Sequence, residues 1–150
     1  MVLQAVPAAR FVIAGRNPGP GVAELAKRPG IEVHANVPDM PRTLREAWVA
    51  VAPMRSGAGI KNKVLEAWAA GKPVVMTSLA GNGLRLDMDA RALVADEPAA
   101  IAALVVRLLR DEEERCRLGA AGYALAAREH SWGDAARRLS RLLAMAGGGP

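Results

Sequence analysis

The stretch from Met54 to Thr77, MRSGAGIKNKVLEAWAAGKPVVMT, predicts a glycine-rich loop, a helix and a buried strand in direct succession. The helix is expected over Lys61–Ala70, and the strand over Val74–Thr77. Glycines let backbone N–H groups approach a ligand closely, and the amino end of a helix carries partial positive charge. A small-residue loop that leads into a helix is therefore typical of a site for an anion.

The charged residues at the start of this helix refine that prediction. Lys61 and Lys63 add positive charge, and Glu66 follows one turn later. A single carboxylate beside a cationic site is a natural acceptor for sugar hydroxyls, so the pattern favours an anion that also carries hydroxyl groups, such as a sugar nucleotide. The alternative for Lys63 and Glu66 is an ordinary surface ion pair, because they are three residues apart on a helix.

The rest of the chain alternates short apolar runs with helical segments. Further strands are expected over Phe11–Gly15, Ile31–Ala35, Trp48–Ala52 and Ala92–Ala95, with helices over Val22–Arg28 and Pro41–Ala47 and a loop over Ala80–Arg85. Three helices are expected after Pro98: Ala99–Arg110, Glu112–Glu129 with a break near Gly119 and Gly122, and Trp132–Met145. This order predicts an α/β fold, a Rossmann-like parallel sheet with helices on both faces and an all-helical C-terminal part.

Ligands of such sheets bind beyond the carboxyl ends of the strands. Three loops rich in glycine or small residues are expected there: Arg16–Gly21, Met54–Gly59 and Ser78–Leu86. The chain of 150 residues shows no internal repeat or linker and is read as one domain.

Composition narrows the function classes. The net charge of +5 fits nucleic acid, a membrane surface or an anionic small molecule as a partner. Aromatic residues are only 3% of the chain, which weakens a nucleic-acid reading because few rings are present to stack on bases. The chain has one cysteine, Cys116, so it forms no internal disulfide. No apolar run approaches the roughly 20 residues of a membrane span.

Two other classes of function have weaker support in the sequence. The run PVVMTS is superficially like a strand of a receiver-type signalling domain, but the acidic cluster and phosphoacceptor aspartate of such a domain have no counterpart. A nucleic-acid-binding module lacks a zinc pattern and a recognisable helix-turn-helix. Asp87 and Asp89 form a D-x-D pair without a third ligand nearby, so no metal site and no cofactor are predicted.

The segment RSGAGIKNKVLEAWAAGKPVVMT resembles the donor-binding segment of retaining GT-B glycosyltransferases of the group 1 (family 4) class, with their G-x-G-I-K-x-K-V-L-E-A pattern. The order of FVIAG, IEVHANVPDMP and WVAVAPMRSG is similar to the middle of the same domain, so the resemblance runs from about Pro7 to Leu143. It implies the C-terminal half of a GT-B fold and a nucleotide-sugar donor linked to UDP, GDP or ADP.

The resemblance also assigns site residues. Glu66 stands where the second Glu of a Glu-x7-Glu pattern hydrogen-bonds the donor ribose, whereas the first Glu is replaced by Ala58. The backbone around Gly59 and Ile60 would meet the donor sugar or diphosphate. The other donor-binding residues implied are Gly15, Arg16, Ser56, Gly57, Lys61 and Lys63. No catalytic residue is assigned.

The resemblance further implies a longer parent enzyme. The family's domain begins with a strand and loop whose Arg and Lys clamp the donor diphosphate, and this chain starts after that unit. The acceptor domain, for a saccharide or lipid-linked acceptor, is also expected elsewhere, so this chain alone is expected to be inactive. The absent strand would lie between those at Phe11 and Trp48, leaving exposed edges that invite association. The parent is expected in bacterial polysaccharide synthesis, in the cytoplasm or at the inner face of the membrane.

Overall fold

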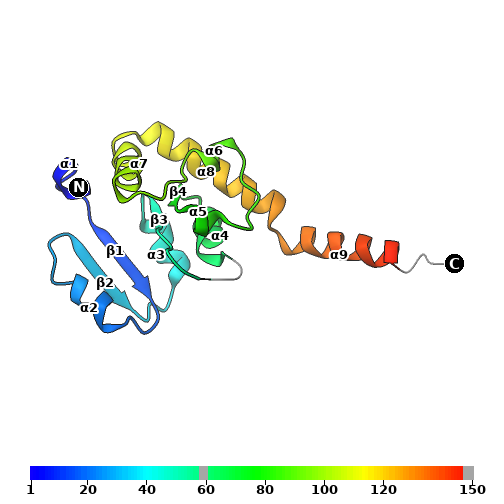
Figure 1. Cartoon of the computed structure of the whole chain (residues 1–150), viewed down its shortest axis with the longest axis horizontal. Coiled ribbons are helices and arrows are strands. Elements are labelled where there is room, and N and C mark those ends of the chain that lie inside the picture. The colour runs from blue at the N-terminus through cyan, green and yellow to red at the C-terminus, as the bar shows by residue number, and fades with distance from the viewer. Residues whose placement is uncertain (58–60, 147–150) are drawn as a thin grey trace.

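A computed structural model describes residues 1–57 and 61–146. The strands are β1 (Phe11–Gly15), β2 (Ile31–Ala35), β3 (Ala50–Ala52) and β4 (Val74–Met76). The helices are α1 (Val2–Ala5), α2 (Pro20–Leu25), α3 (Met40–Glu46), α4 (Asn62–Ala69), α5 (Ser78–Gly81), α6 (Met88–Arg91), α7 (Pro98–Arg110), α8 (Glu112–Glu129) and α9 (Trp132–Ala146). Strands and helices alternate up to β4 and helices follow, so the predicted α/β class is confirmed (Figure 1).

The strands form two parallel pairs instead of the one continuous sheet that the sequence predicted. β1 pairs with β2 from Phe11↔Ile31 onward, and β3 pairs with β4 from Ala50↔Val74 onward. Within the described residues no backbone pairing joins β1 to β3. As a result the apolar strand β1 is poorly covered, and Phe11 remains 44% exposed.

The β3–β4 pair lies between helices on both faces, as predicted. All three residues of β4 are buried, and their side chains alternate between two clusters. Val74 and Met76 pack with residues of α4, whereas Val75 packs with residues of α7 and α8. A short strand that is apolar on both faces requires such two-sided cover.

Two predicted elements after β4 were wrong. The expected strand Ala92–Ala95 is reduced to a single bridge between Val94 and Met76. The expected loop Ala80–Arg85 begins inside α5, because the Thr77 hydroxyl accepts a hydrogen bond from the Ala80 amide at 3.3 Å and caps a helical turn. The turn α6 starts in the same way, with the Asp87 carboxylate accepting from the Ala90 amide at 3.0 Å.

The strand expected from Trp48 begins two residues later, at Ala50. Trp48 is 59% exposed, and the guanidinium carbon of Arg115 lies 4.4 Å from the centroid of its ring. Arg115 itself is buried and donates a hydrogen bond to the Leu108 carbonyl at 3.0 Å. The indole therefore covers a buried arginine at the surface, a cation–π contact, and takes no part in the strand.

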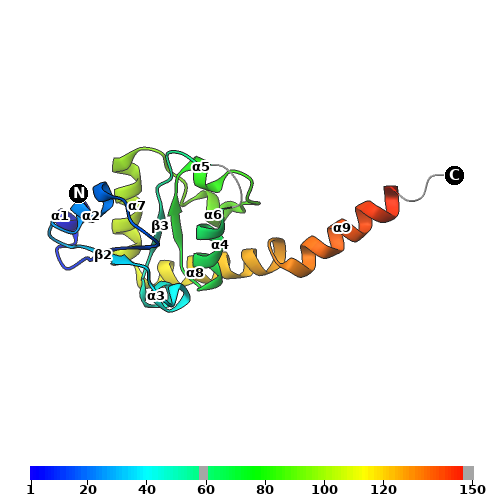
Figure 2. The same ribbon diagram turned by 90° about the horizontal axis from the view of Figure 1, so that it is seen from below.

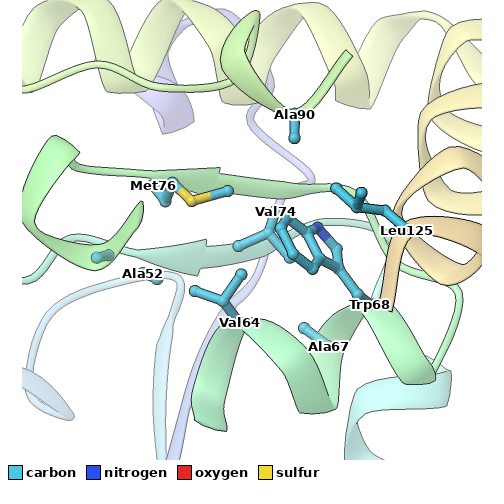
Figure 3. Packing of buried hydrophobic residues seen from close by; sticks show 9 residues of the cluster. Ala52, Val64, Ala67, Trp68, Val74, Met76, Ala90 and Leu125 are labelled. Atoms are coloured by element: carbon cyan, nitrogen blue, oxygen red, sulfur yellow. The ribbon is translucent and has the colours of Figure 1, made fainter. Parts of the chain in front are cut away.

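The main core is centred on Trp68 of α4, which is 2% exposed (Figure 3). The other members of this cluster come from both strands of the β3–β4 pair and from helices α4, α5, α6 and α8: Ala52, Val64, Ala67, Val74, Met76, Ala80, Ala90 and Leu125. Val64, Ala67 and Trp68 form the buried face of α4, and Leu65 is half-buried beside them.

The glycines of α8 do not break the helix, contrary to the prediction, and instead let it approach α4 and the turn after it. A Cβ atom at Gly122 would lie 2.5 Å from Cδ1 of Trp68, and one at Gly119 would lie 2.3 Å from the Gly71 carbonyl oxygen. Both separations are shorter than any normal contact. Glycine is therefore required here for close packing between two helical segments.

The loop after β4 is tied to the segment before α7. The backbone N–H and the hydroxyl of Ser78 both donate to the Asp96 carboxylate, at 2.8 and 2.7 Å. The hydrogen bond from the Ser78 hydroxyl has the larger effect and that from the Ser78 amide the smaller, and both lower the pKa of Asp96 below its ordinary value. The contact joins the start of α5 to the segment that follows the Val94 bridge.

We predict that Gly119→Ala lowers the free energy of unfolding by about 1–3 kcal/mol, measured by urea denaturation, because the new methyl group meets backbone that cannot move aside. The matched control is Gly21→Ala in α2, where a Cβ meets nothing within 4 Å. That change should be neutral or should stabilise by up to about 1 kcal/mol. Equal effects at the two sites would contradict the packing argument.

We predict that Ser78→Ala raises the pKa of Asp96 toward its ordinary value near 3.8, measured by NMR titration of the carboxyl group. Because the folded-state pKa is lowered, the contact stabilises the fold above the unfolded pKa and is lost as the pH falls through the folded one. The variant should therefore lose less stability than wild type on acidification. Ser140→Ala, at an exposed serine of α9, is the control and should leave the pKa of Asp96 unchanged.

Candidate functional site

The loops after β3 and β4 are held together at the carboxyl edge of that strand pair. The Thr77 amide donates to the Ala52 carbonyl at 3.2 Å, and the Thr77 hydroxyl donates to the Met54 carbonyl at 2.8 Å. Thr77 thus links the end of β4 to the start of the glycine-rich loop. The two loops that the sequence placed at this edge therefore lie next to each other, as expected for a ligand site of a parallel sheet.

The amino end of α4 carries an unusual cation. Lys61 occupies the N-cap position, and its carbonyl accepts from the amides of Val64 and Leu65. No side chain in the described part of the chain caps the helix, and the Lys61 residue is only 7% exposed. Among residues 1–57 and 61–146, no hydrogen bond or ion pair reaches its ammonium group.

Lys61 is largely covered as a residue, but its ammonium nitrogen is not among the fully buried, unpartnered atoms of the described residues and so reaches solvent. A cation in this position, without a carboxylate partner among those residues, favours an anion from solution. The uncapped amides of the first turn and the partial positive charge of the helix end favour the same anion. Chemically, this end of α4 is therefore suited to a phosphate or diphosphate.

Lys63 and Glu66 lie on the outer face of α4, and both are exposed. The alternative prediction was a surface ion pair between Lys63 and Glu66. That pair is not formed, since none of the ion pairs in the described part of the chain joins these two residues. The structure thus separates the two predicted lysines. Lys61 lies on the buried side of α4, whereas Lys63 and Glu66 are open to a ligand approaching from solvent.

The preceding loop is accessible where it is described. Ser56 and Gly57 are exposed, and Gly57 has a φ of 125°, which L residues rarely adopt. The predicted binding positions Gly59 and Ile60, together with Ala58, lie outside the described residues. Their assignment stays a prediction.

Gly15 and Arg16 belong to the other strand pair. Gly15 ends β1, where its carbonyl accepts from the Asn36 amide at 2.6 Å, and Arg16 is exposed in the loop that follows. In the described part of the chain, no hydrogen bond or ion pair joins either residue to the loop before α4. The structure does not bring these two residues into direct contact with the rest of the predicted site.

An open cavity of about 700 Å³ lies beyond the carboxyl end of β4. It is lined mainly by the loop and turns that follow β4, including Ser78, Gly81, Asn82, Gly83, Leu86 and Arg91. Its volume falls in the range of small-molecule sites. Arg91 was not predicted as a site residue, because it lies beyond the expected loop and belongs to no recognised motif. Its guanidinium Nε donates a hydrogen bond to the Leu86 carbonyl at 3.1 Å.

The aspartates that suggested a metal are engaged elsewhere. Asp87 caps α6, and Asp89 pairs with Arg117 at 2.9 Å, which raises the pKa of that guanidinium. Over residues 1–57 and 61–146, no group of three or more His, Cys, Asp or Glu side chains is placed to hold a metal ion. The absence of a metal remains a prediction. In the same residues, no helix has the length and apolar character needed to cross a membrane.

Comparison with known proteins identifies the family. The family described as "Glycosyl transferases group 1" matches residues 1–111, which span all four strands and the glycine-rich loop with α4. A search of curated proteins finds no match. The match covers well over half of the chain and includes the site at the amino end of α4, and the chain therefore belongs to the group 1 glycosyl transferases.

Proposed function

We propose that this chain binds the diphosphate of a nucleotide-sugar donor at the amino end of α4. The observation that carries the proposal is the largely covered Lys61 at a helix end without a side-chain cap, whose ammonium group has no partner among the described residues and reaches solvent. A nucleoside diphosphate supplies the negative charge that this position lacks. The group 1 family membership supports a sugar donor over other anions.

The neighbouring residues would read the rest of the donor. The exposed carboxylate of Glu66 is free to accept hydrogen bonds from the two ribose hydroxyls, and Lys63 adds charge on the same exposed face of α4. Backbone amides of the loop before α4, at Ser56, Gly57, Gly59 and Ile60, would donate to the diphosphate or the sugar. Gly15 and Arg16 are proposed to approach the diphosphate from the β1 side.

In the proposed reaction, the bond between the anomeric carbon and the diphosphate oxygen breaks, and its electron pair leaves with the diphosphate. An acceptor hydroxyl forms the new glycosidic bond with retention and gives up its proton to the departing diphosphate. Negative charge grows on the leaving diphosphate through an oxocarbenium-like transition state. Lys61 and the positive end of α4 would stabilise that charge, because both are in place before the reaction begins.

The proposal assigns the donor half of this reaction to the present chain. The acceptor, a saccharide or a lipid-linked saccharide, would be held by residues of a separate domain, as the resemblance implies. We therefore propose donor binding without transfer for the chain alone. No cofactor beyond the donor itself is proposed.

We predict that Lys61→Met weakens binding of the preferred nucleoside diphosphate, chosen from UDP, GDP and ADP, by about 10- to 100-fold, since a charge-assisted hydrogen bond contributes about 1.5–3 kcal/mol. Calorimetry on the purified chain measures this loss. The same variant should be about as resistant to urea as wild type, because no described residue pairs with the ammonium group that is removed.

The control for this test is Lys72→Met, which removes a half-buried lysine just beyond the other end of α4. It should leave nucleotide binding unchanged. If the folded wild-type chain binds none of the three nucleotides, or if both variants bind equally well, the proposed site is wrong.

We predict that Glu66→Gln removes discrimination between a ribonucleotide and its 2′,3′-dideoxy analogue. Wild type should bind the ribonucleotide about tenfold or more tightly, because the carboxylate accepts from both hydroxyls. Affinity for inorganic pyrophosphate should be the same in variant and wild type. Glu113→Gln, on an exposed face of α8, is the control and should preserve the discrimination. If Glu66→Gln still prefers the ribonucleotide as strongly as wild type does, Glu66 does not bind the ribose hydroxyls.

A further inference from the structure

Cations gather around the amino end of α4, where a helix ordinarily favours acidic residues. Lys61 stands at the N-cap position and Lys63 in the first turn, and this first turn contains no acidic residue. The loop that leads into the helix contributes a third cation, Arg55. Because the amino end of a helix carries partial positive charge, cations near it are unfavourable unless an anion joins them.

Arg55 is held at its backbone and open at its side chain. The Met54 carbonyl, which belongs to the same peptide unit as the Arg55 amide, accepts the hydrogen bond of the Thr77 hydroxyl at 2.8 Å. The Met54 side chain packs against the main core, whereas Arg55 is exposed. The start of the loop is therefore fixed, and the Arg55 side chain faces solvent.

The Arg55 guanidinium has no partner in the part of the chain that the structure describes. No ion pair or hydrogen bond among residues 1–57 and 61–146 engages it. Most other arginines of these residues contact a carboxylate or a backbone carbonyl: Arg10, Arg42, Arg85, Arg91, Arg107, Arg110, Arg115, Arg117 and Arg128. The five N–H donors of Arg55 are thus open to a ligand.

Comparison with Arg45, which is exposed and likewise without a partner in the described residues, shows why the position of Arg55 matters. Arg45 lies in the last turn of α3, where the negative end of the helix favours a cation without any ligand. Helix α3 precedes β3 and lies at one end of the β3–β4 pair, whereas α5 lies at the other (Figure 2). Arg55 follows β3 at the carboxyl end, where ligands of parallel sheets bind.

We propose that Arg55 binds the diphosphate of the nucleotide-sugar donor together with Lys61, with one cation for each phosphate. This role rests on the donor site proposed at the amino end of α4, and no motif in the sequence assigned it to Arg55. The planar guanidinium can donate two parallel N–H···O hydrogen bonds to one phosphate, whereas the ammonium group of Lys61 is a point charge for the other. Both cations would then stabilise the charge that grows on the leaving diphosphate.

Calorimetric titration of the full chain tests this role with two probes, the preferred nucleoside diphosphate and inorganic pyrophosphate. Arg55→Gln should weaken binding of both by about tenfold, the factor expected for charge-assisted hydrogen bonds. Arg55→Lys keeps the charge but loses the planar fork, so its affinities should lie between those of wild type and Arg55→Gln. In both variants the preference for a ribonucleotide over its 2′,3′-dideoxy analogue should be unchanged, because Arg55 contacts phosphate alone.

The matched control is Arg45→Gln, which removes the same charge from an exposed arginine at the opposite end of β3. It should leave both affinities close to those of wild type, because salt screens a distant exposed charge. Without ligand, all three variants should melt at about the temperature of wild type, which circular dichroism verifies. Equal losses of affinity in Arg45→Gln and Arg55→Gln would mean that only net charge matters, and would overturn the proposal.

Two further outcomes separate the role of Arg55 from the proposed function. If Lys61→Met weakens nucleotide binding and Arg55→Gln does not, the donor site stands and Arg55 is an ordinary solvated arginine. If the folded wild-type chain binds neither nucleotide nor pyrophosphate, the donor site and the role of Arg55 are both wrong.

Discussion

The close approach of α8 to α4 is the constraint on which the rest of the structure depends. Trp68 of α4 lies against bare backbone at Gly122, and the turn after α4 lies against Gly119. Larger residues at either glycine would push α8 outward and uncover the indole. The contact holds α4 firmly on β3 and β4, and this rigid seating fixes the amino end of α4, where the candidate site lies.

The candidate site is positioned by the packing of α4 on the strands and by one hydrogen bond from Thr77. The Thr77 hydroxyl donates to the Met54 carbonyl, so the start of the glycine-rich loop lies next to the end of β4. The Lys61 residue is largely covered at the helix end, and no carboxylate among the described residues pairs with its ammonium group. An anionic ligand would restore the balance, which gives a physical reason for the donor site that we propose in this group 1 glycosyl transferase.

The two strand pairs leave different surfaces on the molecule. The β3–β4 pair is covered by helices on both faces, whereas β1 keeps Phe11 and Val12 more than a third exposed. The helix α9 adds a second exposed apolar surface far from the first (Figure 1). The chain is thus well packed around α4, whereas apolar side chains are exposed at β1 and on α9.

Local sequence determined most elements of this protein. Strand β2 and helix α8 match their predicted ranges because apolar runs and helix caps act over a few residues. The anion site that we propose before Glu66 was likewise inferred from glycine and lysine spacing alone. Only the tertiary structure decided that Lys61 is enclosed while Lys63 is exposed, that β1 and β3 do not pair, and that Gly119 allows close packing instead of a break. These features depend on contacts between segments far apart in the chain, which no local pattern encodes.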